Sequence, residues 1–129
     1  MRQMLLLFNH QLTDAQAQDA KTVLGVEQFV KMPPDIQTLW AQIPADLPEL
    51  AAYLSPVAEW LQAASTPRDY VLIQGDIGAC CLMAQTARQI GLIPVYATTM
   101  RNAVEASGPD GVVRVTRRFS HVMFRKYQL

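Results

Sequence analysis

Apolar residues fill both alternating sets of positions in two short segments, residues 2–8 and 70–73. An extended chain with this pattern is apolar on both faces, which is typical of strands in a parallel sheet covered by helices on both sides. Residues 26–32 and 92–97 are predicted to form two further strands. The pattern of apolar and polar positions therefore favours an α/β fold.

Helices are expected between these strands. Thr13 followed by Gln16 has the pattern of a capping box, and Gly25 favours a helix end just before it. Ser55, followed by a proline, is the expected N-cap of a helix that runs to about residue 64. Other helices are predicted over residues 35–42, 47–53 and 79–89, and a turn over residues 66–69.

The pattern changes toward the end of the chain. Residues 70–97 follow the order strand, helix, strand, as in a βαβ unit with parallel strands. Beyond them, Val104 and residues 112–119 flank the turn-rich segment 107–111, and residues 121–127 are a last predicted strand. We therefore expect a single α/β domain over residues 1–129, with a mostly parallel sheet flanked by helices and a C-terminal antiparallel β extension.

Composition and charge exclude several classes of protein. The chain has 129 residues, half of them hydrophobic, with eleven Lys and Arg against eleven Asp and Glu. Proteins that coat long nucleic acids carry a basic excess, so a net charge of zero argues against that class. No apolar run approaches the roughly 20 residues that span a bilayer, and the first apolar stretch is short for a signal peptide. We expect a cytoplasmic protein with no membrane partner.

The net charge of zero hides a division along the chain. Through Thr66 there are three basic and seven acidic residues, a net charge of −4, and the remainder of the chain carries +4. Six basic residues lie in the last 29 positions, and this segment is a candidate surface for a small polyanion. A solvated strand face is the alternative. The six residues are Arg101, Arg114, Arg117, Arg118, Arg125 and Lys126.

Polar residues follow three of the predicted strands. Asn9 and His10 come after the first, Gln74, Gly75 and Asp76 after the third, and Thr98 with Thr99 after the fourth. In an open α/β sheet, ligands bind outside the carboxyl ends of the strands, so these groups are expected along one edge. An ordinary strand exit is the alternative for each group taken alone.

The turn from Gly75 to Gly78 lies between a predicted strand and a predicted helix. Glycines there let the backbone approach a phosphate, whose oxygens free N–H groups can bind. The carboxylate of Asp76 would repel a phosphate, so we expect it to cap the helix or to bind a ribose hydroxyl.

The candidate acid–base groups are His10 and His121, the two histidines of the chain. His10 follows the first strand at the expected ligand edge, whereas His121 lies in the basic segment and is equally well explained as a strand-face residue.

Cys80 and Cys81 are expected to be buried thiols, because neighbouring helix positions suit neither chelation nor a disulfide. No HExxH, paired-carboxylate or GxSxG pattern occurs. A reaction without metal or cofactor, or simple binding, remains.

Several segments carry a family resemblance, above all YATTMR and FSHVMFRKY, together with LLLFNHQLTDAQ, PPDIQTLWAQIP and QGDIGA. The chain resembles the small stand-alone ring nucleases of type III CRISPR systems. The resemblance implies a Rossmann-like homodimer that binds a cyclic oligoadenylate and ends an antiviral signal by cutting the ring. The ring that it implies first is cyclic tetra-adenylate. It also implies metal-independent attack by a ribose 2′-hydroxyl, giving linear products with a 2′,3′-cyclic phosphate.

Position in the predicted fold assigns roles within that reaction. Arg101 is expected on the phosphate, His10 near the 2′-hydroxyl, and His121 is a reserve catalytic candidate. Two alternatives remain open: a sensor or sponge that binds the ring without cutting it, and a protein-interaction module that uses the arginine-rich segment. The expected ligand-binding residues are Asn9, Gln74, Gly75, Asp76, Gly78, Thr98, Thr99 and Arg118.

Overall fold

The chain folds around one five-stranded sheet with the strand order β2-β1-β3-β4-β5. The computed structural model describes the backbone of residues 1–129 and every side chain except those of Asn102, Val104 and Arg117, so the predicted role of Arg117 in the basic segment lies outside the described side chains. The strands are β1 (Gln3–Leu7), β2 (Gln28–Lys31), β3 (Tyr70–Ile73), β4 (Ile93–Ser107) and β5 (Val113–Lys126). The helices are α1 (Asp14–Val23), α2 (Pro34–Ala41), α3 (Ser55–Ala64) and α4 (Ile77–Gln89).

The sheet is mostly parallel, as expected. Strand β1 pairs in parallel with β2 and β3, β3 pairs in parallel with β4, and only β5 is antiparallel to its neighbour. From β1 the chain first moves outward to β2 and then returns past β1 to β3. This reversal creates a switch point between β1 and β3, where doubly wound α/β proteins bind ligands.

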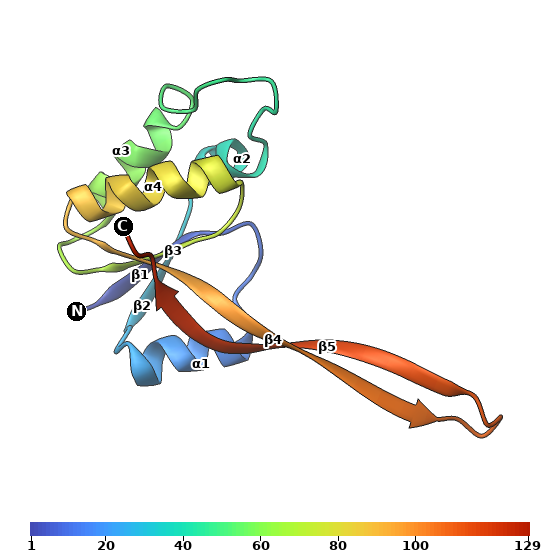
Figure 1. Cartoon of the computed structure of the whole chain (residues 1–129). Helices are drawn as coiled ribbons and strands as arrows, with labels where there is room; N and C mark the ends of the chain where they lie inside the picture. Colours follow the sequence, from blue (N-terminus) through green and yellow to red (C-terminus); the bar gives the residue numbers. More distant parts are fainter.

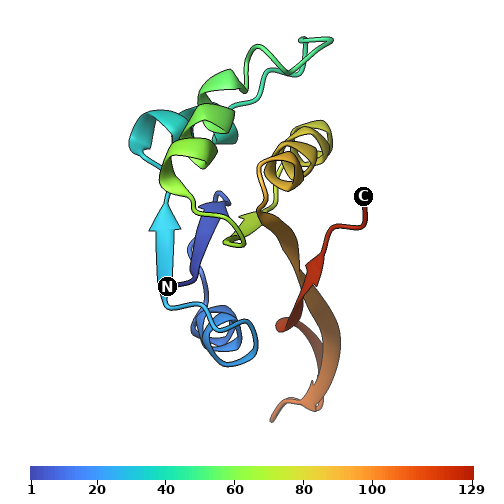
Figure 2. The same cartoon turned by 90° about the vertical axis from the view of Figure 1, so that its left-hand side faces the viewer.

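Helices cover both faces of the sheet. Helix α1 lies on one face, and α2, α3 and α4 lie on the other (Figures 1 and 2). Alternating residues of β1 therefore enter two separate cores: Leu5 and Leu7 pack under α2–α4, whereas Met4 and Leu6 pack with Ala20 of α1. The burial of consecutive residues confirms the prediction of a strand that is apolar on both faces.

Local signals at the first helix are confirmed. The Thr13 side chain accepts a hydrogen bond from the Gln16 N–H at 3.1 Å, and the Gln16 side chain accepts one from the Thr13 N–H at 3.0 Å. These two bonds form the capping box. Gly25 follows the helix with a φ of +70°, a conformation that favours glycine.

The predicted helix over residues 47–53 is wrong. The segment forms bends and turns, and the single Oη proton of Tyr53 is shared between the Leu39 and Gln42 carbonyls, at 2.8 and 3.0 Å, at the end of α2. The tyrosine thus satisfies backbone acceptors of the preceding helix, and Pro48 lacks an N–H with which to continue a new one. The N-cap of α3 is Leu54 in place of the predicted Ser55.

The C-terminal extension is longer than predicted. Strand β4 continues to Ser107, and the two strands predicted over residues 112–119 and 121–127 form one strand, β5. Pairing between β3 and β4 ends at Leu72 and Val95, so the later residues of β4 run past the carboxyl edge of the sheet. Residues 99–120 form a two-stranded arm that projects from the body (Figure 1).

Candidate functional site

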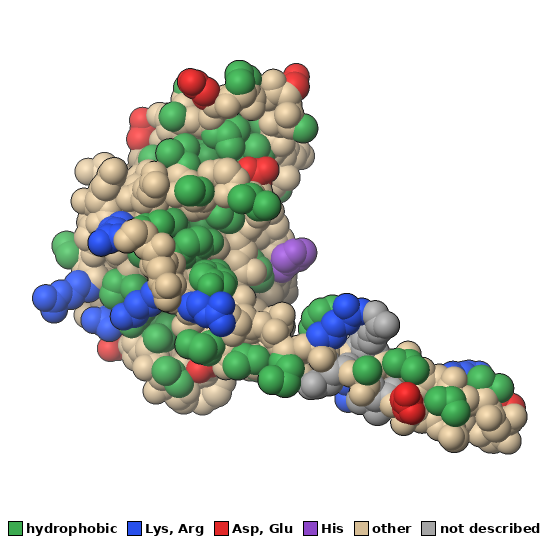
Figure 3. Space-filling view, in the orientation of Figure 1, with side chains coloured by type: hydrophobic (Ala, Val, Ile, Leu, Met, Phe, Trp, Pro, Cys, Tyr) green, Lys and Arg blue, Asp and Glu red, His purple; other side chains and the backbone are tan. Residues whose placement is uncertain are grey.

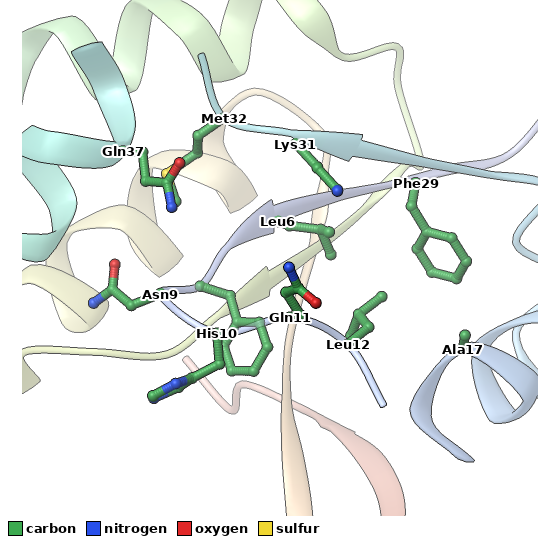
Figure 4. Close-up of a pocket in the computed structure, with 11 residues that line it drawn as sticks. Leu6, Asn9, His10, Gln11, Leu12, Ala17, Phe29, Lys31, Met32 and Gln37 are labelled. Atoms are coloured by element: carbon green, nitrogen blue, oxygen red, sulfur yellow. The ribbon is translucent and has the colours of Figure 1, made fainter. Parts of the chain in front are cut away.

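A pocket of about 580 Å³ lies at the carboxyl ends of β1 and β2. We call it the strand-end pocket. The loop after β1 contributes Asn9, His10 and Gln11, the end of β2 contributes Lys31, and α2 contributes Gln37. Figure 4 shows Lys31 and Gln11 over the middle of the pocket, with Asn9 and His10 toward one end. Its apolar walls are Leu6, Phe8, Leu12, Ala17, Phe29 and Met32.

The polar groups of this pocket are cationic or neutral. Among the described side chains that line it there is one lysine and one histidine, with three amides and no carboxylate. The His10 ring packs edge-on against Phe8, with ring centroids 5.5 Å apart. Amides, aromatic rings and one cation together suit a ligand that carries both a flat polar ring and an anionic group.

Gln74, at the end of β3, is held by three hydrogen bonds. Its N–H donates to the Leu7 carbonyl at 3.0 Å, and its carbonyl accepts from Trp40 Nε1 at 3.0 Å. Its side-chain Oε1 accepts from the Ala97 N–H at 2.8 Å. Gln74 therefore ties the carboxyl ends of β1 and β3 to the first part of β4, and its side-chain oxygen has a structural partner.

The carboxylate of Asp76 caps α4. Its Oδ2 accepts a hydrogen bond from the Ala79 N–H at 3.0 Å, which confirms the capping interpretation. The helix begins at Ile77, two residues before the predicted start. Any phosphate at this helix end would have to share the first turn with a negative charge.

Gly75 lies in the turn before α4, whereas Gly78 lies in the first turn of that helix. A Cβ on Gly75 would lie 3.1 Å from Trp40 Nε1, and the buried Trp40 is held by its bond to Gln74. We expect Gly75→Ala to lower the free energy of unfolding by about 1–3 kcal/mol, because the indole cannot move without losing this bond.

Gly78→Ala is the matched control for that substitution. A Cβ there would lie 3.5 Å from Asp76 Oδ2 and 3.6 Å from Leu50 Cδ1, which are ordinary contacts, and alanine favours a helix over glycine by about 1 kcal/mol. We expect the stability of this variant to be unchanged or raised. Urea denaturation of both variants measures the difference, and equal losses of stability would contradict the close contact with Trp40.

The threonines and arginines predicted at the edge lie on β4 and on the arm. Thr98 Oγ1 and the backbone of Met123 are joined by hydrogen bonds of 3.2 Å across the two strands. Arg101 is exposed, and its guanidinium lies 5.8 Å from the centroid of the Phe119 ring. Thr99 and Arg118 are also exposed. None of these side chains lines the strand-end pocket.

His121 is buried between β5 and α1. Its Nε2 lies 2.7 Å from Asp19 Oδ2, and its ring packs on Phe124 with centroids 4.8 Å apart. Only 5% of the His121 side chain is exposed, and within the described part of the chain its Nδ1 has no hydrogen-bond partner. The structure thus separates the two histidines: His10 lines the pocket, and His121 joins the base of the arm to α1.

A second, more apolar pocket of about 510 Å³ lies between α4 and the last strands. Gln74 and Gly75 line it, together with Tyr96 and Tyr127. Burial raises the pKa of Cys80, which lines this pocket from α4 and is buried as predicted. Cys81 is exposed, so the prediction of two buried thiols is wrong for it, because neighbouring helix positions face different sides.

Sequence reasoning missed Lys31, Gln11 and Gln37 as pocket residues. Lys31 ends a strand just as Asn9 follows one, so the same rule of strand ends would have identified it. Gln37 carries no comparable signal, because its position beside the pocket depends on how α2 crosses the sheet.

The fold and the strand-end pocket define a doubly wound α/β protein with a candidate ligand site at the carboxyl edge of its sheet. The chain belongs to the family described as "Uncharacterized protein MJ1673 family", whose model matches residues 2–125. It is 45% identical over 127 residues to the "Uncharacterized protein MJ1673" of Methanocaldococcus jannaschii, with 98% of each chain covered. No solved structure matches the chain.

Among the described residues, no group of three or more His, Cys, Asp or Glu lies together as a set of metal ligands. None of the helices described is long and apolar enough to cross a membrane.

Proposed function

We propose that this protein is a ring nuclease that binds cyclic tetra-adenylate and opens it without a metal ion or cofactor. In this role it would act in the cytoplasm to end the antiviral signal of a type III CRISPR system. The observation that carries the proposal is the strand-end pocket, where His10 and Lys31 lie with amides and aromatic rings at the carboxyl edge of an α/β sheet. The segments that resemble ring nucleases, among them LLLFNHQLTDAQ, support it further.

The lining of the pocket supports an adenosine nucleotide as its occupant. Asn and Gln side chains can bind the N6 and N7 edge of adenine through two hydrogen bonds. Asn9, Gln11 and Gln37 offer such amides, and the Phe8 and Phe29 rings offer surfaces for a base. Lys31 supplies positive charge for the phosphate, with no lining carboxylate among the described residues to oppose it.

The proposed reaction is an internal transfer at phosphorus. His10 takes the proton of a ribose 2′-hydroxyl, and the 2′-oxygen attacks the adjoining phosphorus. The bond from phosphorus to the 5′-oxygen of the next nucleotide breaks, and that oxygen takes up a proton. The products carry a 2′,3′-cyclic phosphate and a free 5′-hydroxyl. Lys31, which lines the pocket, would stabilise the charge that builds up on the phosphate oxygens.

The size and symmetry of the ring support a dimer. A volume of about 580 Å³ lies within the range of single small-molecule sites, whereas the ring contains four nucleotides. Two copies related by a two-fold axis would present the same pocket to opposite halves of the ring. Each copy then needs few cations, in keeping with a chain of zero net charge.

Binding without cleavage is the second candidate function. It is favoured by the separation of the three catalytic candidates: Arg101 lies against Phe119 on the arm, and His121 is buried against Asp19. Only His10 lines the strand-end pocket. A sensor or sponge would need the pocket and its cation but no base.

Incubation of excess full-length protein with labelled cyclic tetra-adenylate, with and without EDTA, tests the proposal. We expect linear products with cyclic phosphate ends in both conditions, and parallel incubations with cyclic tri- and hexa-adenylate test ring size. If the protein binds the ring tightly and the ring is recovered intact, the protein is a sponge or sensor and the proposed cleavage is wrong. If calorimetry detects no binding of any ring, both candidate functions are wrong.

A further inference from the structure

The arm exposes large apolar side chains away from both cores. Phe119 is 69% exposed, and Val113 and Val115, at alternating positions on the same strand face, are 57% and 54% exposed. A two-stranded hairpin alone is at best marginally stable in water, and clustered exposed apolar residues mark contact surfaces. A surface of another molecule is therefore expected to cover the arm.

The charge of the arm indicates what that surface carries. Residues 99–120 contain four arginines against Glu105 and Asp110, a net charge of +2. Arg114 pairs with Asp110 within the arm at 3.7 Å. Two arms paired with each other would bring like charges together, whereas an acidic surface with apolar residues would complement the arm.

The body of the same protein carries such a surface. Residues 32–67 include four exposed acidic residues and no Lys or Arg, and Leu47 is an exposed apolar residue among them. Ile77, at the start of α4, is 88% exposed and lies beside this segment, because Leu50 approaches the neighbouring Gly78. Figure 3 shows acidic and apolar side chains together over this end of the molecule. We call the exposed acidic residues of this segment, together with the exposed Leu47 and Ile77, the acidic cap: Asp35, Asp46, Leu47, Glu49, Glu59 and Ile77.

We propose that the arm of one copy docks on the acidic cap of a second copy, and that the second arm docks on the first cap. The arm of a chain points away from its own α2–α3 layer, so a cap can be reached only between copies (Figure 1). The arm leaves the sheet at the carboxyl edge, and Ile77 borders the same edge. A two-fold dimer of this kind therefore brings the two strand-end edges together. The size and symmetry of the ring in the proposed function favour a dimer, but they do not define this surface.

Sedimentation equilibrium of the full-length protein without nucleotide tests the docking surface. We expect the wild type to be a dimer and Val115→Asp to raise its dissociation constant about 100-fold, since a roughly tenfold loss occurs at each of two identical contacts. The far-ultraviolet circular dichroism spectrum should stay unchanged, because Val115 lies outside both cores. Val23→Asp is the matched control: Val23 is an exposed valine on α1, and we expect its replacement to leave the dimer intact.

Charge reversal tests the partner surface. Asp46→Arg with Glu49→Arg should weaken the dimer, and adding Arg114→Glu to the same chain should restore part of the affinity. A monomeric wild type, or a dimer that is insensitive to Val115→Asp or to the cap variant, would overturn the proposal. The outcome is independent of the proposed function, because a monomer that cleaves the ring refutes only the docking. A dimer that forms through the arm but neither binds nor cleaves the ring refutes only the proposed function.

Discussion

His10→Ala is expected to slow the opening of cyclic tetra-adenylate by about 10²- to 10⁴-fold, the usual contribution of a general base. The Kd of the ring should change far less, because Lys31 and the pocket amides remain. His10 is exposed and contacts Phe8 edge-on, so its removal leaves both cores intact. Single-turnover cleavage measures the rate constant, and calorimetry measures binding.

Added imidazole separates a base from a group that only shapes the pocket. A free base can enter the space that His10→Ala vacates, so partial recovery of the rate is expected if His10 takes the 2′-hydroxyl proton. A His10→Ala variant that cleaves at the wild-type rate would show that the role assigned to His10 is wrong. In that case in-line positioning of the 2′-oxygen would have to supply the rate enhancement.

The parts of the fold that followed from the sequence rest on local interactions. Thr13 and Gln16 are three residues apart, and their capping box forms as expected. Asp76 caps the helix that follows it directly. The four consecutive buried residues of β3 carry their own signal, because a strand without polar positions has to be covered on both faces.

The features of the fold that could not be predicted from the sequence depend on contacts between residues far apart in the chain. His121 meets Asp19 across 102 positions of sequence, and the register of β5 decides which face His121 occupies. A bulge between Thr98 and Thr99 shifts that register, and a shift of one residue moves each side chain to the opposite face. No local pattern could therefore have separated a buried His121 from a histidine at the ligand edge.

The candidate site likewise combines features that local sequence predicts with features that depend on contacts between distant residues. The rule that ligands bind at the carboxyl ends of strands led to Asn9 and His10, which do line one pocket. The rule did not distinguish them from Gln74, whose side chain binds the Ala97 N–H of a neighbouring strand. Strand ends can thus be located from sequence, but whether a polar group there faces a ligand or another strand depends on tertiary packing.

Asp69→Ala is expected to lower the free energy of unfolding by about 2–4 kcal/mol. Asp69 is buried at the amino end of β3, and its carboxylate accepts four hydrogen bonds. Gln3 donates two, at 3.1 and 2.9 Å, and Thr66 donates two, at 2.9 and 3.0 Å. Removing the carboxylate leaves these partly buried donors without their acceptor. Asp14→Ala, at an exposed carboxylate, is the control, with an expected loss below about 1 kcal/mol in guanidinium denaturation.

The contribution of Asp69 should also depend on pH. Burial by itself raises the pKa of Asp69, but the hydrogen bonds from Thr66 and Gln3 outweigh it and hold the pKa below its ordinary value of 3.8. The folded protein therefore binds this proton less tightly than the unfolded chain does. The stabilisation is fully present above the ordinary pKa and is lost as the pH falls through the lower, folded value. The stability gap between wild type and Asp69→Asn should narrow from about pH 5 downward, and a gap that stays constant to pH 2 would contradict the hydrogen-bonded carboxylate.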